Sequence, residues 1–320
     1  MHMAGILYLL STTLLALYGL NMLAHVCVYW WQRGAGGPPA VERAASSLGD
    51  DHLPLVMVQL PIYNERDVAA RLIHAVARLD WPVDRLLVQV LDDSTDDTTA
   101  IVATALSCYR EWGQHVEHVR RPSRTGYKAG ALQYGLASSA ADFVAIFDAD
   151  FVPPADFLRR TIPFFADPSV ACVQARWGHI NAEESGFTQA QALGFDGHFI
   201  VEKQARDAVG AFTHFNGSAG VWRRAAIDAA GGWQADTLTE DFDLSYRAQL
   251  AGWRIVYCGD VVVPAELPVQ LDAFRRQQHR WAKGSMQTAG KLLGQLWRAP
   301  QPLWRKVFGT LHLTNYLAHP

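Results

Sequence analysis

Three acidic clusters and one basic, aromatic run hold the side chains of this sequence that are best suited to chemistry. In chain order they are Asp92-Asp93-Ser94, Asp148-Ala149-Asp150, Thr239-Glu240-Asp241 and Gln277-Gln278-His279-Arg280-Trp281. Carboxylates at strand ends can hold a divalent cation, and a cation held in this way can bind a diphosphate. A later carboxylate can act as a base, and an Arg-Trp pair can bind a phosphate and a sugar ring. This order indicates transfer of a sugar from a nucleotide diphosphate.

The Asp148-Ala149-Asp150 turn is the candidate metal site. It follows the apolar segment 143–147, which we expect to be a strand. Mg²⁺ and Mn²⁺ prefer oxygen ligands and keep positions free for phosphate oxygens, so both carboxylates are candidate ligands of one ion. Such turns also occur on surfaces without any ligand, and the tripeptide alone does not decide. Its place directly after a strand favours the metal site.

Asp93 and Lys128 are candidate nucleotide-binding residues. Asp93 follows the apolar segment 86–91, and acidic residues at strand ends bind nucleotides in several folds. Lys128 lies in a glycine-flanked turn, where a point charge can meet a phosphate. The alternatives are that the acidic pair matches the dipole of a following helix capped by Ser94, and that Lys128 is a solvated lysine near a helix start.

Asp241 is the candidate catalytic base. An inverting glycosyl transfer needs one group to take the proton of the attacking hydroxyl. The alternative is that an acid in the first turn of a helix only matches the helix dipole. In the later run, Arg280 can pair with a diphosphate and Trp281 can stack on a pyranose ring. The alternative there is a basic helix face with one apolar anchor.

Composition bounds the kind of protein. The 320 residues are half hydrophobic, enough for one large domain or two small ones. The net charge of −3 shows no basic excess, so we expect no nucleic-acid partner. The four cysteines are scattered without the spacing of a zinc site or a disulfide framework, which fits a reducing compartment.

Apolar segments alternate with helical segments along the middle of the chain, which predicts a mostly parallel α/β sheet. Ligands of such sheets bind beyond the carboxyl ends of the strands. We therefore expect Asp93 and Asp148 to face one crevice. The expected strands are 55–60, 86–91, 115–119, 143–147, 170–174 and 254–257, and the expected helices are 66–79, 95–112, 128–138, 156–165, 187–206, 240–251 and 271–297.

Residues 1–33 are predicted to form a transmembrane helix. Residues 4–31 carry no Asp, Glu, Lys or Arg, and about 20 apolar residues are enough to cross a bilayer. The stretch ends in Tyr29-Trp30-Trp31 and Arg33, as in the aromatic belt of a membrane span. A cleaved signal and a buried helix are the alternatives. The positive-inside rule places the following residues in the cytoplasm, beginning with a Gly- and Pro-rich linker at 34–52.

The last 55 residues predict further contact with a membrane. Residues 266–300 are amphipathic and basic, as in helices that lie on a membrane surface, although packing against the sheet fits the same periodicity. Residues 301–320 are apolar and too short to span, and we interpret them as the start of a further membrane segment. The sequence looks like a fragment of a longer membrane protein.

Together the motifs resemble the family 2 glycosyltransferases, and among them the processive β-glycan synthases of the cellulose synthase group. That family carries an Asp, an Asp-x-Asp, a Thr-Glu-Asp and a Gln-x-x-Arg-Trp in this order, found here as Asp93, Asp148/Asp150, Asp241 and Gln277/Arg280/Trp281. Longer segments look like the cellulose synthase-like A and C branch, which makes mannan, glucomannan and xyloglucan backbones. They are QLPIYNE at 59–65, QVLDDSTD at 89–96, GYKAGAL at 126–132, QARW at 174–177 and FNGSAGVWR at 215–223.

The resemblance spans residues 55 to 283 and implies a GT-A fold over 53–265, a mixed sheet flanked by helices. It implies Mg²⁺ or Mn²⁺ on Asp148 and Asp150, and an inverting mechanism with Asp241 as base. The implied donor is GDP-mannose or UDP-glucose, and the implied acceptor is the end of a β-linked polysaccharide at the cytoplasmic face of the membrane. The implied nucleotide site is Asp93, Lys128 and Asp148, the diphosphate and acceptor-end site is Gln277, Arg280 and Trp281, and the acceptor site is shaped by Trp177, Phe215, Asn216, Gly217, Ser218 and Glu240.

Other functions stay open. A non-processive membrane enzyme that adds one sugar to a lipid fits the same motifs, and an inactive nucleotide-sugar-binding subunit would keep the fold without the chemistry. A nucleotide-dependent oxidoreductase is excluded, because no Gly-x-Gly-x-x-Gly follows an expected strand. The family's synthases have several more transmembrane helices after the Arg-Trp motif, which this sequence lacks.

Overall fold

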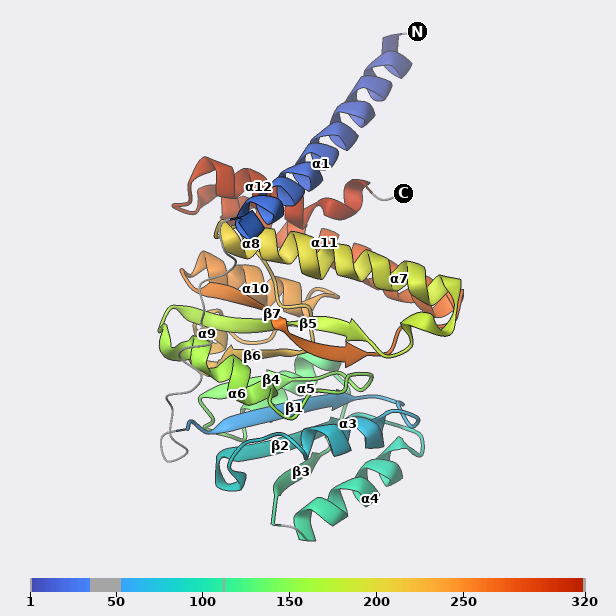
Figure 1. The fold of residues 1–320 in the computed structure, drawn as a ribbon, viewed down its shortest axis with the longest axis vertical. Coiled ribbons are helices and arrows are strands. Elements are labelled where there is room, and N and C mark those ends of the chain that lie inside the picture. Colours follow the sequence, from blue (N-terminus) through green and yellow to red (C-terminus); the bar gives the residue numbers. More distant parts are fainter. Residues whose placement is uncertain (1, 35–52, 112, 319–320) are drawn as a thin grey trace.

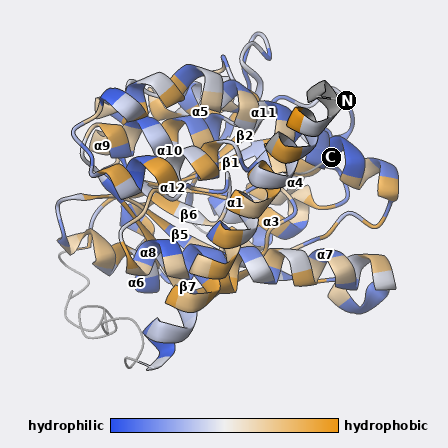
Figure 2. Ribbon diagram, turned by 90° about the horizontal axis from the view of Figure 1, so that it is seen from above, coloured by the Kyte–Doolittle hydropathy of each residue, from blue (hydrophilic) through white to orange (hydrophobic). Residues whose placement is uncertain are grey.

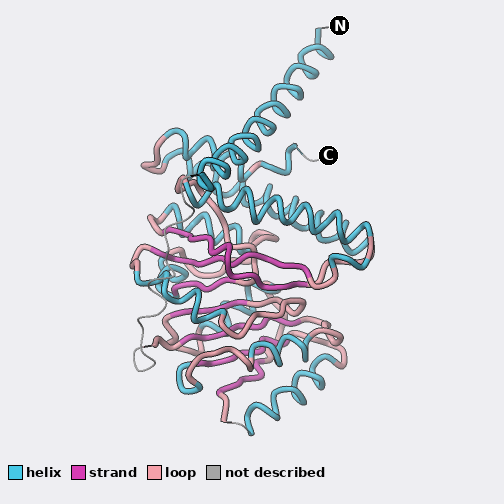
Figure 3. Tube along the Cα trace, viewed as in Figure 1, coloured by secondary structure: helices cyan, strands magenta, loops and turns pink. Residues whose placement is uncertain are grey.

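Seven strands form one mixed sheet in the computed structural model, which describes residues 2–34, 53–111 and 113–318. Across the sheet the strands lie in the order β3-β2-β1-β4-β6-β5-β7. Figure 3 shows them stacked from β3 at the bottom to β5 and β7 near the top. The strands are β1 (Val56–Ile62), β2 (Leu86–Asp92), β3 (His115–Val119), β4 (Phe143–Ile146), β5 (Val170–His179), β6 (Gly220–Arg223) and β7 (Arg254–Ala265).

One strand runs against the rest. β1 pairs in parallel with β2 and β4, β2 with β3, and β5 with β7, whereas β6 is antiparallel to both β4 and β5. In the β4–β6 register Ile146 lies opposite Gly220. The loop before β6 therefore enters the sheet beside the turn that follows β4. The predicted α/β sheet is confirmed, and its reversed strand brings the segment 213–219 to the edge where the parallel strands end.

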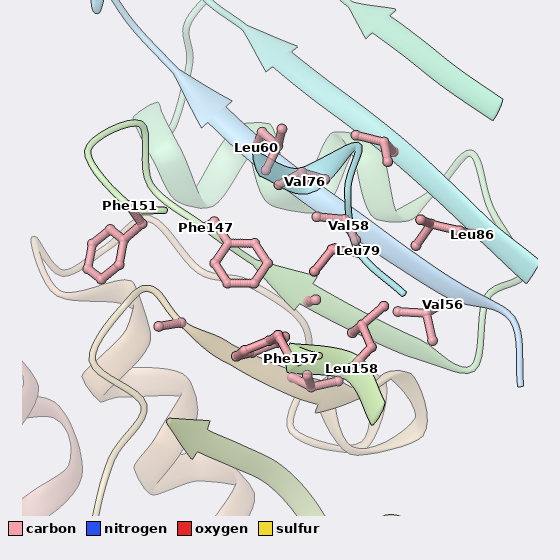
Figure 4. Packing of buried hydrophobic residues seen from close by; sticks show 14 of the residues in the cluster. Val56, Val58, Leu60, Val76, Leu79, Leu86, Phe147, Phe151, Phe157 and Leu158 are labelled. Carbon is pink, nitrogen blue, oxygen red and sulfur yellow. The ribbon is translucent and has the colours of Figure 1, made fainter. Parts of the chain in front are cut away.

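Helices cover both faces of the sheet, which explains why β1 and β2 are almost continuous apolar runs. One buried cluster packs β1 and β4 against α3 (Ala69–Val76), α4 (Thr98–Glu111) and α6 (Phe157–Thr161). Figure 4 shows Val58 and Leu60 of this face beside Phe147 and Phe157. A second cluster packs the opposite face against α5 (Tyr127–Leu136), α9 (Arg224–Ala229) and α10 (Glu240–Leu250). The short helices η2 (Val83–Arg85), η3 (Ile162–Ala166) and η4 (Ala182–Glu184) complete the domain.

The alternative that Ser94 caps the following helix is wrong. Helix α4 begins at Thr98 rather than at residue 95, and the backbone N–H of Thr98 donates to Asp96 Oδ1 at 3.0 Å. The Ser94 hydroxyl instead accepts the backbone N–H of Asn64 at 3.0 Å, which ties the end of β2 to the loop after β1. Thr239 stands at the N-cap of α10, but its side chain makes no capping bond. A side chain caps a helix only in one rotamer. Here contacts with distant parts of the chain set the rotamer of Ser94 instead.

A long helical layer lies beyond β7 (Figure 1). It contains α7 (Gly186–Asp196), a π-helix η5 (Gly197–Lys203) and α8 (Gln204–Ala208), and alongside them α11 (Leu271–Arg298). The rings of Phe187 and Phe274 meet at 5.5 Å, which holds α7 against α11. Helix α12 (Leu303–Leu313) and η6 (Asn315–Ala318) follow. The prediction that 301–320 begins a further membrane segment stays a prediction, since α12 has 11 residues.

Helix α1 (His2–Gly34) projects away from the domain (Figure 1). Within the described residues it is the one helix that is long and apolar enough to cross a membrane, over Ser11–Gly34. Its exposed side chains include Leu15, Leu23 and Trp30, and Figure 2 shows hydrophobic residues along it. The Tyr18 hydroxyl donates to the Thr314 carbonyl at 2.7 Å, so α1 is fixed to η6 and α12 at its base. Residues 35–52, most of the expected linker, lie outside the described residues.

Candidate active site

The Asp148-Ala149-Asp150 turn and the loop before β6 form the centre of the candidate site. The turn follows β4, and the backbone N–H of Asp148 donates to the Ser218 hydroxyl at 2.9 Å. Ser218 is fully buried, so this bond is shielded from water. The next residues of the turn join β7, since the Glu266 N–H donates to the Asp150 carbonyl at 3.2 Å. The turn is therefore fixed from two sides beside the loop, and we call the place where the turn, Lys128, Gly217 and Asp241 meet the crevice.

Lys128 links three of the predicted segments. Helix α5 starts directly after Gly126, whose φ of +75° is left-handed, and this start aims Lys128 at the crevice. Lys128 Nζ donates to Asp148 Oδ1 at 2.5 Å and to the Gly217 carbonyl at 2.9 Å, and it lies 3.9 Å from Glu240 Oε1. Burial alone would lower the pKa of Lys128, but Asp148 and Glu240 raise it above its ordinary value. The lysine is therefore charged at this junction.

Gly217 allows Asp241 and Lys128 to approach the loop. Its φ is +83°, and a Cβ placed on it would lie 3.0 Å from Asp241 Oδ2 and 3.4 Å from Lys128 Nζ. A side chain here would be strained by the backbone and would press on both charged groups. The Asp241 carbonyl accepts the Ser245 hydroxyl at 2.6 Å, and the same hydroxyl accepts the Phe215 N–H at 2.9 Å. Helix α10 and the loop are thus bonded to each other beside the site.

Two carboxylates of the crevice have strongly raised pKa values. Burial, together with the charge of Asp148, raises the pKa of Asp150 to about 7. Burial and the neighbouring Glu240 raise the pKa of Asp241 to about 7. Neither carboxylate has an ion-pair partner among the described residues. A site that crowds carboxylates in this way favours a bound cation or a bound proton.

Glu65 belongs to the same crowded group, and sequence reasoning gave it no role. Burial and the charge of Asp148 raise its pKa, although part of the side chain is exposed. It follows β1 in the segment 59–65, so its place at the end of a parallel strand was a usable signal. Asp150 in turn feels the charge of Glu65.

Asp93 is held by an arginine that sequence reasoning also missed. Arg121 Nε donates to Asp93 Oδ1 at 3.0 Å, and Arg121 Nη2 donates to Asp93 Oδ2. The two side chains are 7% and 8% exposed, so the pair is nearly dry. Arg121 also donates to the Thr125 and Tyr127 carbonyls, which shapes the approach to Lys128. Asp93 is not a helix cap, and a role in nucleotide binding stays a prediction.

The residues expected to shape the acceptor site lie on the other side of the loop. Trp177 Nε1 donates to the Ser218 carbonyl at 3.2 Å. The Trp177 ring lies 5.8 Å from Phe195, and Phe195 lies 6.0 Å from Trp281, so an aromatic row joins β5, α7 and α11. Phe215 is fully buried against Trp222 and reaches the crevice only through its backbone.

Helix α11 brings its motif close to the start of α10. A Cβ on Gly284 would lie 2.5 Å from Thr239 Cγ2, so the two helices touch at this glycine. Arg280 is exposed, and its charge acts on Glu240: burial raises the pKa of Glu240, while Lys128 and Arg280 oppose the rise. Gln277 Oε1 is buried without a partner among the described residues. Within the part of the chain that the structure describes, this acceptor has no partner and the Arg280 guanidinium is exposed, so both can bind a polar ligand.

The protein alone offers an incomplete cage for a metal ion. Within the described ranges, no group of three His, Cys, Asp or Glu side chains is placed to hold one. Asp148 and Asp150 supply two carboxylates, and the unneutralised charge at Asp150 fits a cation. Mg²⁺ and Mn²⁺ sites with one or two carboxylates are completed by phosphate oxygens and water. The donor set therefore suits an ion that arrives with a diphosphate.

Comparison with known proteins identifies relatives. Residues 54–284 match the family described as glycosyltransferase like family 2. Glucomannan 4-beta-mannosyltransferase 1 of Oryza sativa subsp. japonica is 47% identical over 268 residues, which is 81% of this chain and 51% of that protein. Glucomannan 4-beta-mannosyltransferase 2 of Arabidopsis thaliana is 45% identical over 267 residues, 82% of this chain and 50% of that protein. The chain thus spans about half the length of these curated relatives.

Solved structures share the fold. The mannosyltransferase PcManGT from Pyrobaculum calidifontis, in complex with GDP-Man and Mn²⁺, superposes with a TM-score of 0.67 at 22% identity, covering 96% of this chain and 81% of that one. S. aureus TarS 1-349 in complex with UDP-GlcNAc superposes with a TM-score of 0.59 at 15% identity, covering 82% and 72%. The predicted GT-A fold is confirmed. With more than half of its length matched by the family, this chain belongs to the family 2 glycosyltransferases.

Proposed function

We propose that this chain is the catalytic part of a β-mannan or glucomannan synthase. It would transfer mannose from GDP-mannose, with inversion, to the growing end of a β-linked polysaccharide. The observation that carries the proposal is the junction of Lys128, Asp148, Gly217 and Asp241 within one crevice. The names of the relatives at 47% and 45% identity support mannose as the sugar, and the GDP-Man in the PcManGT complex supports GDP as the nucleotide. UDP-glucose is the competing donor.

Asp241 would act as the general base. A base with a pKa near the working pH is ionised often enough to accept a proton and basic enough to hold it, and the pKa of Asp241 is raised to about 7. Its Oδ2 faces the Gly217 backbone from the start of α10. From there it would accept the proton of the acceptor hydroxyl as that oxygen attacks the anomeric carbon.

Lys128 and the Asp148-Ala149-Asp150 turn would hold the diphosphate. Mg²⁺ or Mn²⁺, when bound, offsets charge on the leaving diphosphate, and the Mn²⁺ in the PcManGT complex supports this requirement. Asp148 and Asp150 would be its protein ligands. Lys128 would then exchange its contact with Asp148 for one with a phosphate oxygen, while the Gly217 carbonyl keeps its ammonium group in place.

The remaining predicted residues would bind the nucleotide part of the donor and the terminal sugar of the acceptor. Asp93 would contact the nucleoside, held in position by Arg121. Arg280 would pair with the diphosphate, Gln277 would bond to the acceptor end, and Trp281 would stack on the terminal sugar. The row that continues from Trp281 through Phe195 to Trp177 suits the apolar face of a pyranose.

Helix α1 would anchor the catalytic domain to a membrane. Its apolar stretch Ser11–Gly34 is long enough to cross one. Arg33 at its end supports a cytoplasmic location for the catalytic domain, by the positive-inside rule. The exposed side chains of α12, among them Leu303 and Trp304, would meet the same membrane surface. Donor would then come from the cytoplasm and the acceptor would extend toward the membrane.

Parallel donor assays test the proposal. Membranes that contain the full chain are incubated with Mn²⁺ and either radiolabelled GDP-mannose or UDP-glucose, and the product is digested with β-mannanase. We expect labelled polymer from GDP-mannose that β-mannanase releases, and loss of label in excess chelator. Polymer formed from UDP-glucose alone would contradict mannose as the transferred sugar. A lipid that carries a single added sugar would contradict a polysaccharide as the acceptor. No transfer from either donor would overturn the enzyme assignment.

A further inference from the structure

A partly buried hydrogen-bond chain lies behind the loop that carries Gly217. It is built on three histidines from separate parts of the chain: His198 on the π-helix η5, His214 in the loop and His312 on α12. Asn216 Nδ2 lies 3.2 Å from His198 Nε2 and 3.1 Å from His214 Nε2. His214 Nδ1 lies 3.1 Å from His312 Nε2. The chain thus joins the helical layer to the loop through one side-chain amide.

The amide nitrogen of Asn216 fixes the direction of these bonds on one side. An amide nitrogen can only donate, so the Nε2 atom of His198 must accept and its proton must sit on Nδ1. That atom lies 2.9 Å from Glu202 Oε2, and Glu202 Oε1 accepts Arg206 Nε at 2.8 Å. With the amide turned over, its Oδ1 atom, which has no hydrogen-bond partner among the described residues, would accept from both rings, and His198 would carry protons on both nitrogens. In the orientation of the structure, His198 carries one proton, on Nδ1, and donates it to Glu202.

The same logic runs through the other branch. His214 Nε2 accepts from Asn216, so His214 Nδ1 carries the proton and donates to His312 Nε2. His312 Nδ1 then donates to the Tyr246 hydroxyl at 2.8 Å, and that hydroxyl donates to the Gly309 carbonyl at 3.1 Å. Each donor meets one acceptor along this branch, which ends on a backbone carbonyl.

The surroundings favour the neutral form of His214 and His312 and the ionised form of Glu202. Burial lowers the pKa of His214 and of His312 well below the ordinary value, and the charge of Lys203 acts in the same direction on both. Burial alone would raise the pKa of Glu202, but Arg206 and His198 hold it well below the ordinary value. His214 and His312 are therefore neutral and Glu202 is ionised, as the tautomers require.

The chain ends where the catalytic groups begin. Asn216 precedes Gly217, whose carbonyl accepts Lys128. Ser218, one residue further, accepts the Asp148 N–H. Tyr246 lies on α10, the helix that starts with Glu240 and Asp241. The loop is thus held from behind by histidines and from the front by the groups that the proposed reaction uses.

We propose that His198, His214 and His312 are positioning residues: they hold Asn216, and through it the Gly217 carbonyl, at the place where the loop meets Lys128 and Asp241. This inference rests on the proposed transferase function for its kinetic test. None of the three is catalytic, because within the described residues none is hydrogen-bonded to the Asp148 turn, Lys128 or Asp241. They act on the loop at 213–219, where a small displacement of the backbone would strongly lower the rate of transfer.

Substitution of His214 tests the role, because the chain offers a matched control. His74 Nδ1 lies 2.5 Å from the Tyr109 hydroxyl on the far side of the sheet, a histidine–tyrosine pair like that of His312 and Tyr246. We expect His214→Leu to lower kcat for mannosyl transfer by about 100-fold, the scale of a 1 Å misplacement, with a smaller rise in donor KM. His74→Leu leaves kcat unchanged. His214→Gln, which returns an acceptor toward Asn216, recovers most of the loss.

Tyr246→Phe provides a second variant with little change in volume, in case His214→Leu does not fold. It removes the acceptor of His312, and Tyr109→Phe is its control. Hydrogen–deuterium exchange over residues 213–219 reads out position without activity: it becomes faster in His214→Leu or Tyr246→Phe and stays unchanged in the two controls. Wild-type kcat in the chain variants, or an equal loss in the controls, would overturn the positioning role. Faster exchange in the two chain variants, together with a wild-type protein that transfers no sugar, would keep this role and contradict the proposed function.

Discussion

Two acidic clusters lie at the carboxyl ends of β2 and β4, the two strands that flank β1, and their surroundings differ in one respect: how far the protein itself neutralises the carboxylates. After β2, Asp92 accepts His118 Nε2 at 2.8 Å and the Ser94 N–H at 2.8 Å, and Asp93 is paired with Arg121. After β4, Asp150 has no ion-pair partner among the described residues, and its pKa is raised to about 7. The first cluster is satisfied by the protein itself. The second can still bind a ligand. This difference indicates that the cluster after β2 stabilises the fold, whereas the cluster after β4 takes part in the reaction.

The largest effect is expected from Asp241→Asn. Loss of a general base lowers rates by roughly 10²–10⁴-fold, so we expect kcat for transfer to fall by about 10³-fold while GDP binding stays within twofold of wild type. Asp236→Asn is the control, since Asp236 is an exposed residue paired with Lys291 away from the crevice. Radiolabel transfer and calorimetric titration with GDP and Mn²⁺ measure the two quantities. A kcat near the wild-type value would remove Asp241 from the role of base.

The pH dependence of the rate tests whether a carboxylate of raised pKa controls the reaction. The base must be ionised, and the pKa of Asp241 is raised to about 7. The transfer rate should therefore rise about tenfold per pH unit below pH 7 and level off above it. Rates of kcat/KM between pH 5 and 9 measure this limb. A rate that is flat from pH 5 would show that no group of raised pKa controls the reaction.

Gly217→Ala separates a site effect from a backbone effect. Gly217 and Gly210 both have left-handed φ, +83° and +64°, but a Cβ on Gly210 meets nothing within 4 Å. Both alanine variants should lose about 1 kcal/mol of unfolding free energy. Only Gly217→Ala should also lower kcat, by about tenfold, because its methyl group presses on Asp241 and Lys128. Thermal unfolding and transfer assays of the pair measure both effects, and equal kcat values would contradict the close packing at Gly217.

The last pair of variants compares the two clusters directly, through the stability of the fold. Asp92→Asn should lower the unfolding free energy by about 2 kcal/mol, because it breaks charge-assisted bonds of a fully buried carboxylate. Hydrogen bonds lower the pKa of Asp92 against the effect of burial, so this advantage of the wild type exists above pH 4 and is lost as the pH falls. Asp150→Asn should leave the melting temperature unchanged or higher, since it removes a like charge. Equal melting losses in both variants would erase the contrast between the clusters.

The fold was largely predictable where apolar runs are local. The expected strand 86–91 lies within a residue of β2, because β2 is buried along its whole length and its apolar run can be recognised without knowing its partners. β5 runs on to His179, five residues beyond the expected end. Its second half pairs with β7 across a register shift, and such a pairing between distant segments leaves no local pattern.

The acidic residues of the site could be predicted from the sequence, but most of the side chains that bind and position the site could not. The motif acids stand at strand and helix ends, which the sequence shows. Arg121 lies 28 positions from Asp93, and their contact depends on how β3 lies beside β2. The histidine chain includes a hydrogen bond between residues 98 positions apart. The positions of the histidines in the sequence do not predict such a contact. Partners of this kind are set by packing, so they emerge only from coordinates.

The position of bound Mn²⁺ tests the central claim most directly. Crystals of the chain grown with GDP and Mn²⁺ give an anomalous signal that locates the ion. We predict one strong peak within coordination distance of Asp148 and Asp150, with the diphosphate between the ion and Lys128, and with Asp241 across the crevice. An ion and nucleotide bound elsewhere, with the crevice empty, would contradict the account.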